Sequence, residues 1–387
     1  MTGGDLFRKQ QVFERRAQIL VSLKHPEEVL AMRHIYGAGF FLIGLYTPEA
    51  ERLRHLCDVK GIPPDEAKKL MKRDDEEPLA HGQQARDAFQ LSDVFIRVDQ
   101  PDELDRGLAR FLDLVFGNPR VTPTSDEHAM FLAFAASSRS AALGRQVGAV
   151  ILSKDGDVLA VGANDVPRFG GGQYWPGPSD QRDHQRGHDS NATQRAEIVR
   201  DIARRLVEAG VVDGTDKERL RAVESAVQTS RLLDITEYGR EVHAEMEALL
   251  SCARSGGGTR SGTLFTTTFP CHNCAKHVVG AGLSRVVFVE PYPKSKAFDL
   301  HDDALTFDDS EKERKVLLQP FVGVGPRRYL DLFTLRLGIG SPLDRKVGNM
   351  VAPWRKYGAS PRVQMTPMSY LEKERVAEGR RGIRSDA

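Results

Sequence analysis

Two short segments carry side chains whose types and spacing suit a metal centre. The first is His243-Ala244-Glu245, and the second is Pro270-Cys271-His272-Asn273-Cys274. Catalytic zinc sites use three protein ligands and leave a fourth position open, and one imidazole with two thiolates forms such a set. We therefore expect His243, Cys271 and Cys274 to hold a catalytic zinc ion.

The spacing within these segments also assigns local roles. Cys271 and Cys274 are three residues apart, so one helical turn would place both side chains on one face. The positive end of a helix beginning after Pro270 would favour thiolate over thiol. Glu245 is two residues from His243 and is expected to carry a proton between a zinc-activated water and the substrate.

A structural zinc site is the main alternative interpretation of the same residues. Such a site needs a fourth Cys or His ligand. His272 would face a different side of its predicted helix, and Cys252 lies within an apolar helical run. Catalysis is therefore the favoured interpretation.

The elements that must position these residues are predicted from the spacing of apolar side chains. Helices are expected at 126–142, 191–209, 243–254 and 271–281, and strands at 147–152, 158–163, 263–268 and 285–289. Short strands that alternate with helices favour a mixed α/β sheet covered by helices. The polar stretch 165–240, rich in glycine at its start, is interpreted as an insertion.

The length of 387 residues allows two units. Asn118-Pro119 and Pro123 interrupt the chain near residue 120, where we place a boundary. Residues 1–120 are predicted to form a smaller, mostly helical region, and 121–340 to form the zinc domain. Residues 341–387 form a basic C-terminal extension.

Composition excludes several classes of protein. A formal net charge of +1 gives no general attraction to nucleic acid or membranes. Four cysteines in so long a chain argue against a disulfide-stabilised secreted protein. The longest apolar run, Ile35–Tyr46, is too short to cross a bilayer. The cytoplasm is the expected compartment, with no membrane partner.

Residues 126 to about 335 resemble the deoxycytidylate deaminase family of the cytidine-deaminase fold. H-x-E followed by P-C-x-x-C is the zinc signature of nucleobase deaminases. Arg145-Gln146-Val147-Gly148-Ala149-Val150 is similar to the first strand of that family. Gly162–Pro167 resembles its Gly-Tyr-Asn-Gly-x-Pro loop, with Ala163 in place of tyrosine and Asp165 in place of the second glycine. The resemblance implies a cytidine-deaminase-like mixed sheet sandwiched by helices.

A closer resemblance is to the bacterial antiphage deaminases called DcdV or AvcD, in the segments Ser22–Tyr46, Glu290–Ser295 and Gln319–Phe333. It implies deamination of dCTP or dCMP to dUTP or dUMP in phage defence, and control by an inhibitory small RNA. It also implies an allosteric nucleotide such as dTTP and a homo-oligomer, a hexamer. The family's P-loop pattern, G-x-x-x-x-G-K-[ST], is missing. Residues 1–120 are therefore interpreted as a remnant of its kinase-like regulatory domain.

The resemblance also implies how substrate is bound. Asn164 would hydrogen-bond the sugar hydroxyl, the backbone at Ala244 would meet the pyrimidine edge, and Tyr292 would pack on the sugar or base. Phosphate groups need cationic side chains or backbone amides, and the candidates are Arg139, Arg145 and Lys294.

Within the insertion, His184 and His188 are four residues apart. They would hold a second, structural zinc ion only if their segment is helical, because a helix would place both rings on one face. The favoured alternative is a polar, solvated loop.

Two other functions share parts of this pattern. A polynucleotide deaminase acting on flipped cytosine or adenine would use the same metal chemistry. An RNA-regulated binding module would use the basic tail, including Arg380, Arg381 and Arg384, to contact phosphates. A flexible, solvated terminus is the favoured interpretation of that tail.

Overall fold

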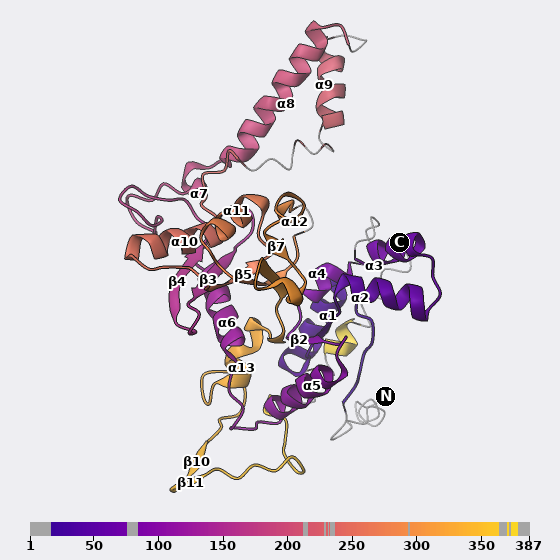
Figure 1. Ribbon diagram of the computed structural model, residues 1–387, viewed down its shortest axis with the longest axis vertical. Helices are drawn as coiled ribbons and strands as arrows, with labels where there is room; N and C mark the ends of the chain where they lie inside the picture. The colour runs from indigo at the N-terminus through magenta and orange to yellow at the C-terminus, as the bar shows by residue number, and fades with distance from the viewer. Residues whose placement is uncertain are drawn as a thin grey trace, which may run out of the picture. The chain divides into compact units, whose positions relative to one another are not determined.

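The structure is a computed structural model that describes residues 17–75, 84–211, 216–227, 230, 232, 237–292, 295–363, 370 and 373–377. The chain divides into two compact units, drawn together in Figure 1. One unit comprises Met1–Glu127 with Val322–Ala387, and the other comprises His128–Phe321. Residues from 322 onward therefore group with the N-terminal residues, an association that the sequence pattern did not indicate.

The first unit contains a small sheet with two parallel strands. β1 (Ile43–Tyr46) runs parallel to β2 (Val94–Arg97), and β9 (Gly323–Val324) pairs antiparallel with β2. The helices of this unit are α1 (Pro26–Tyr36), α2 (Glu49–Arg54), α3 (Pro64–Asp75), α4 (Ala85–Phe89), α5 (Pro101–Val115) and α13 (Tyr329–Phe333). Shorter elements are η1 (Gly37–Gly39), the π-helical η2 (His55–Val59), η5 (Pro326–Arg328) and the hairpin of β10 (Lys346–Val347) with β11 (Met350–Val351).

A buried carboxylate joins the two chain segments of this unit. Asp93 is fully buried and accepts hydrogen bonds from Arg33 at 3.0 Å and from Arg328 at 3.1 Å. Its second oxygen accepts a hydrogen bond from the Leu42 amide at 2.7 Å. A buried charge is tolerated when it is paired and hydrogen-bonded, as here. Asp93 therefore fixes residues distant in sequence around the start of β2.

The second unit is built on a mixed six-stranded sheet. Its strands are β3 (Gly148–Leu152), β4 (Val158–Ala163), β5 (Thr263–Thr268), β6 (Arg285–Glu290), β7 (Leu305–Thr306) and β8 (Val316–Pro320), in the order β4-β3-β5-β6-β8-β7. β3 is antiparallel to both β4 and β5, whereas β5, β6, β8 and β7 run parallel. Its helices are α6 (Ser125–Ser137, of which residues 125–127 group with the first unit), α7 (Asp183–Arg186), α8 (Ser190–Glu208), α9 (Asp216–Val227), α10 (Ala244–Ser255), α11 (His272–Gly280) and α12 (Ala297–Leu300), with the short η4 (Asp309–Glu311).

Helices cover both faces of this sheet, and two glycines show how closely they approach. A side chain at Gly148 would overlap the carbonyl oxygen of Ala133 in α6, and one at Gly162 would overlap that of Ala244 in α10. Gly162 pairs with Ala149, the neighbour of Gly148, so the two glycines face opposite sides of the sheet. The expected mixed α/β sheet sandwiched by helices is confirmed.

The core of the second unit lies between the sheet and the pair α10 and α11. Ile151, Leu264 and Val286 are fully buried there, together with Ala248 of α10 and Val278 of α11. Because the metal-ligand segments begin these two helices, the same packing that stabilises the core also positions the site.

Replacing Gly148 by alanine should destabilise the protein because the added methyl group would meet backbone that cannot move aside. We expect a loss of about 1–3 kcal/mol, typical of overpacking, and a lower melting temperature. Gly144→Ala is the matched control, since its methyl group would meet no atom within 4 Å. Equal melting temperatures for the two variants in thermal denaturation would contradict the close approach of β3 and α6.

The insertion predicted at 165–240 contains α7, α8 and α9, and α8 packs along α9 (Figure 1). Asp189 caps α8 by accepting a hydrogen bond from the Ala192 amide. None of the helices in the described part of the chain is long and apolar enough to cross a membrane.

Candidate active site

The three expected metal ligands come together at the starts of two helices. His243 is the N-cap of α10 and Cys271 is the N-cap of α11, while Cys274 lies in the first turn of α11. Nδ1 of His243 is 3.3 Å from Sγ of Cys271 and 3.4 Å from Sγ of Cys274. All three potential ligand atoms lie within 4.8 Å of one another.

This donor set fits zinc. Tetrahedral zinc with Zn–S bonds of about 2.3 Å and Zn–N bonds of about 2.0–2.1 Å places neighbouring nitrogen and sulfur ligands roughly 3.5 Å apart. The distances of 3.3 and 3.4 Å are close to that value. Within the described ranges, this is the only group of three or more His, Cys, Asp or Glu side chains close enough to share an ion.

The electrostatics of the cluster favour one thiolate. Hydrogen bonds from Cys274 and from His243 lower the pKa of Cys271 to about 4, although burial acts in the opposite direction. The same hydrogen bond to Cys271, with the charge of Glu245, raises the pKa of His243 to about 9. The pKa of Cys274 is raised because it donates to Cys271 and is buried. A bound metal would replace the protons on His243 and Cys274.

Glu245 lies in the first turn of α10 and is buried, with 4% of its surface exposed. Burial is the main cause that raises the pKa of its carboxyl group, and a hydrogen bond with the Cys274 side chain acts in the opposite direction. The carboxyl group is therefore within hydrogen-bond reach of a metal ligand. A carboxyl group with a raised pKa is suited to take up and return protons.

Asn164 and Ala244 are both buried. The Asn164 side chain donates to the Arg145 carbonyl at 2.8 Å and accepts from the Val147 amide at 2.7 Å. It therefore shapes the backbone that enters β3. Ala244 is the first residue of α10, directly between His243 and Glu245. The contacts of Asn164 and Ala244 with substrate stay predictions.

Arg145 and Tyr292 lie close to each other. The Arg145 guanidinium pairs with Glu290 and lies 5.9 Å from the centre of the Tyr292 ring. Arg145 is 56% exposed, so its charge remains accessible to an anionic ligand. Lys294, the third candidate for phosphate binding, lies outside the described residues.

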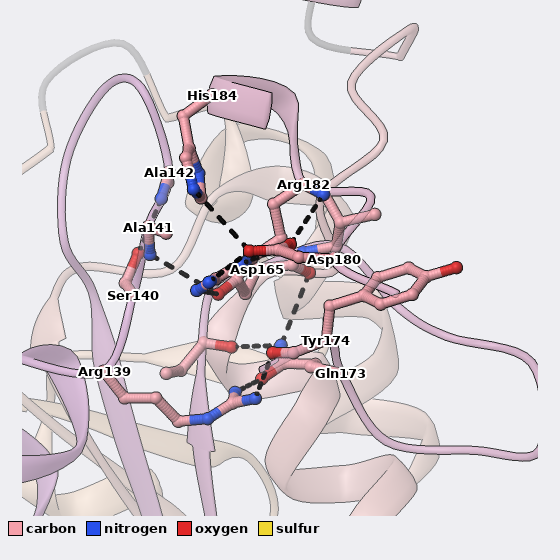
Figure 2. Close-up of polar contacts among 12 residues, drawn as sticks. Arg139, Ser140, Ala141, Ala142, Asp165, Gln173, Tyr174, Asp180, Arg182 and His184 are labelled. Carbon is pink, nitrogen blue, oxygen red and sulfur yellow. Dashed lines mark hydrogen bonds and ion pairs between the residues drawn. The ribbon is translucent and has the colours of Figure 1, made fainter. Parts of the chain in front are cut away.

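Arg139 instead fixes the loop that follows β4 (Figure 2). Its guanidinium donates to the Gln173 side chain and to the Tyr174 carbonyl, and it lies 4.1 Å from the centre of the Trp175 ring. Burial lowers its pKa. A phosphate contact at Arg139 would have to replace these hydrogen bonds.

The helical condition for a second zinc site at His184 and His188 is not met. α7 ends at Arg186, and Gly187 adopts a left-handed conformation, so His188 lies beyond the helix. His184 instead lies 3.7 Å from a carboxylate oxygen of Asp180. The condition for placing both rings on one helical face is therefore absent, and the less favoured interpretation of this segment as a second zinc site has no support from its geometry.

A buried polar network next to His243 was not foreseen from the sequence. Asp165 forms a backbone bridge with Val242, the residue before His243, through hydrogen bonds of 3.3 and 3.0 Å. Its carboxylate lies 3.6 Å from Arg182, which also binds Asp180 through two hydrogen bonds of 2.9 and 2.7 Å (Figure 2). The only signal in the sequence was Asp165 itself, which replaces a glycine of the resembling loop.

Replacing Arg182 by methionine should weaken this network because Asp165 and Asp180 would lose their buried cationic partner. We expect the melting temperature to fall by roughly 5 °C or more, since breaking a buried ion pair by removing one partner is strongly destabilising. Zinc retention should also fall, because Asp165 braces the residue before His243. Arg186→Met, at the exposed end of α7, is the matched control and should change neither property.

The segment that contains the candidate metal ligands is similar to a known zinc-binding region. Residues 123–290 match the cytidine and deoxycytidylate deaminase zinc-binding region. This segment contains His243, Glu245, Cys271 and Cys274. The matched segment is thus similar to the zinc-binding region of the cytidine and deoxycytidylate deaminases, and the match and the donor set together support zinc as the metal.

Two relatives illustrate the extent of the similarity. The chain is 39% identical over 56 residues to the deoxycytidylate deaminase of Enterobacteria phage T4, which covers 14% of this chain and 29% of the phage protein. It is 47% identical over 49 residues to a probable deoxycytidylate deaminase of Drosophila melanogaster, which covers 12% and 23% of the two chains. The chain thus spans less than a third of the length of each relative.

Among solved structures, the dCMP deaminase of cyanophage S-TIM5 in complex with dCMP and dUMP is similar over 52% of this chain and 100% of the phage chain. The sequence identity is 17% and the TM-score is 0.30.

Proposed function

We propose that this protein catalyses the zinc-dependent hydrolytic deamination of deoxycytidine nucleotides, dCTP or dCMP, to dUTP or dUMP and ammonia. The observation that carries the proposal is the cluster of His243, Cys271 and Cys274 with the buried Glu245 beside it. Its position in a segment that matches a deaminase zinc-binding region supports the same conclusion.

The metal and Glu245 have different roles in the proposed reaction. Zinc, when bound, acts as a Lewis acid that activates a water molecule for attack on C4 of the cytosine ring. A carboxylate oxygen of Glu245 takes one proton from that water and delivers it to the ring nitrogen N3, and it then carries the second proton, from the new hydroxyl group on C4, to the departing amino group. The C4–O bond forms first, and the C4–N bond breaks once the amino group is protonated, so water and cytosine give uracil and ammonia.

Substrate contacts in this proposal come from residues around the site. Arg145 offers an accessible charge for a phosphate group, and Tyr292 lies beside it. Asn164 contacts the sugar, and the backbone at Ala244 meets the pyrimidine edge. We also propose that Lys294 and Arg139 contact phosphate groups. Arg139 would have to exchange its hydrogen bonds with the 173–175 loop for this contact.

A substrate panel tests the proposal directly. Purified zinc-loaded protein is incubated with dCTP, dCMP, CTP and a single-stranded oligonucleotide containing cytosine, and the loss of cytosine absorbance is followed. Turnover of dCTP or dCMP is the expected result. Turnover of the oligonucleotide alone would identify a polynucleotide deaminase instead, and no turnover of any substrate would exclude deamination of these compounds.

On the family resemblance, we further propose a cytoplasmic homo-oligomer, a hexamer, that depletes deoxycytidine nucleotides during phage infection. An inhibitory small RNA and an effector nucleotide such as dTTP would control it, with residues 1–120 as the remnant of a kinase-like regulatory domain. Nucleotide pools measured in infected cells test the defence role, with a Glu245→Gln strain as the comparison. Equal dCTP levels in both strains after infection would contradict that role.

A further inference from the structure

Gln173 belongs to the loop that follows β4, and it holds the backbone on both sides of Asn164. Only 4% of Gln173 is exposed. Its Nε2 atom donates hydrogen bonds to the carbonyl oxygen of Ala163 at 2.5 Å and to that of Asp165 at 3.4 Å. Because these two residues flank Asn164 in the chain, one buried side-chain amide fixes both of its neighbours.

The partners of Gln173 allow its amide group only one orientation. Oε1 accepts a hydrogen bond from the Arg139 guanidinium, and the two groups face each other in Figure 2. A guanidinium group can only donate and a carbonyl group can only accept, so Nε2 must face the carbonyl oxygens. The bonds to these oxygens do not involve Arg139, so they stay if Arg139 turns toward a phosphate group.

The backbone of Gln173 is fixed as well as its side chain. It forms an antiparallel bridge with Pro167, and the Tyr174 amide donates to the Val166 carbonyl at 3.1 Å. The loop therefore folds back on the residues that follow Asn164. A side chain held at its base in this way can fix the backbone that it contacts.

Asn164 extends this constraint to the segment that enters β3. Its side chain accepts a hydrogen bond from the Val147 amide at 2.7 Å and donates one to the Arg145 carbonyl at 2.8 Å. We propose that Gln173 is a positioning residue, which sets the place of Asn164, and through it that of Arg145, for the nucleotide. The inference rests on the proposed function, in which Asn164 and Arg145 contact the substrate.

Hydrogen exchange of the substrate-free, zinc-loaded chain tests this role without any turnover. Gln173→Met keeps an unbranched side chain of similar length but has no donor, so both carbonyl oxygens lose a shared partner. The Val147 amide, followed in a peptide that covers residues 145–150, should then exchange roughly tenfold faster than in the wild type. Zinc content should stay unchanged, because the carboxylate of Asp165 keeps its contact with Arg182.

Steady-state kinetics with dCMP and dCTP separates positioning from a general loss of stability. Gln173→Met should raise KM roughly tenfold and leave kcat within a few-fold, because the substrate contacts are displaced while the metal ligands and Glu245 are not. Partial unfolding alone would lower the active fraction and leave KM unchanged. In an Asn164→Ala background Gln173→Met should raise KM no further, since both residues act on the same contact.

Gln319→Met is the matched control. The Gln319 side chain also accepts a hydrogen bond from an arginine, Arg285, at 2.6 Å, but it lies on β8, with β6, β5 and β3 between that strand and β4. This variant should change neither the exchange of the Val147 amide nor KM. Gln173→Glu, which keeps a partner for Arg139 but has no donor when ionised, preserves the test if Gln173→Met misfolds.

Three results would overturn the proposal. The Val147 amide could exchange at the wild-type rate in Gln173→Met. KM could stay unchanged although that exchange becomes faster, or the Asn164→Ala background could leave the whole effect of Gln173→Met on KM. A wild-type chain that turns over neither nucleotide would instead exclude the proposed deamination, and the exchange measurement would still decide whether Gln173 positions Asn164.

Discussion

Replacing Glu245 by glutamine should nearly abolish deamination while zinc stays bound. The substitution preserves the size of the side chain but removes the group that accepts and returns protons. General acid–base catalysis of this kind contributes about 10²- to 10⁴-fold to the rate, so we expect kcat with dCMP or dCTP to fall within or beyond that range. His243, Cys271 and Cys274 are unchanged, so the zinc content measured by elemental analysis should remain one ion per chain.

Glu247→Gln provides the matched control for this experiment. Glu247 lies on the same helix, is also buried, and pairs with Arg254 rather than with the metal ligands. The same chemical change at this position should leave kcat within a few-fold of the wild-type value. A Glu245→Gln enzyme that retains most of its activity would contradict the proton-carrier role, and one that loses zinc would show that Glu245 helps to hold the metal.

The metal centre could be predicted because its ligands are specified by local sequence. Cys271 and Cys274 are brought together by a single helical turn, and a helix beginning near each ligand segment follows from the apolar spacing. Only the approach of His243 to the cysteines depends on tertiary structure, through the packing of α10 on α11. The type and spacing of the ligands were sufficient to infer that approach.

The support around His243 could not be predicted in the same way. The bridge between Asp165 and Val242 joins residues separated by the whole insertion, and the Arg182 side chain reaches Asp165 from a loop with no periodic pattern. Sequence spacing describes neighbours along a helix or strand, but it does not describe which loops meet. The grouping of Val322–Ala387 with the N-terminal unit could not be predicted for the same reason. It depends on the pairing of β9 with β2, a strand that is distant in sequence.

Arg139 shows the limit of assigning roles from residue type. A guanidinium group can donate hydrogen bonds to phosphate oxygens and to carbonyl oxygens alike, so the residue type does not say which partner it has. In the structure its hydrogen bonds go to Gln173 and Tyr174, and its flat face lies against Trp175. Only the fold reveals these partners, because the 173–175 loop is distant in sequence from α6. The charge of Arg145, in contrast, remains accessible at the surface.

Cys271→Ala should lose the zinc ion and all deamination with it. Mutation of a residue that hydrogen-bonds a metal ligand typically weakens metal binding about 10- to 100-fold, and loss of a direct ligand should exceed that range. Acidification should release zinc from the wild-type protein for a related reason, because the imidazole and thiolates bind protons in competition with the metal. Both effects can be followed by zinc release to a colorimetric chelator.

Cys252→Ala separates the loss of a ligand from the loss of a thiol. Cys252 is buried in α10 among the apolar residues of the core, and its pKa is raised by burial, as expected for an inert thiol. This variant should unfold at a somewhat lower temperature, because a buried sulfur is lost, yet retain zinc and activity. Stoichiometric zinc in Cys271→Ala, or its loss from Cys252→Ala, would show that the metal is not held by the cluster at the starts of α10 and α11.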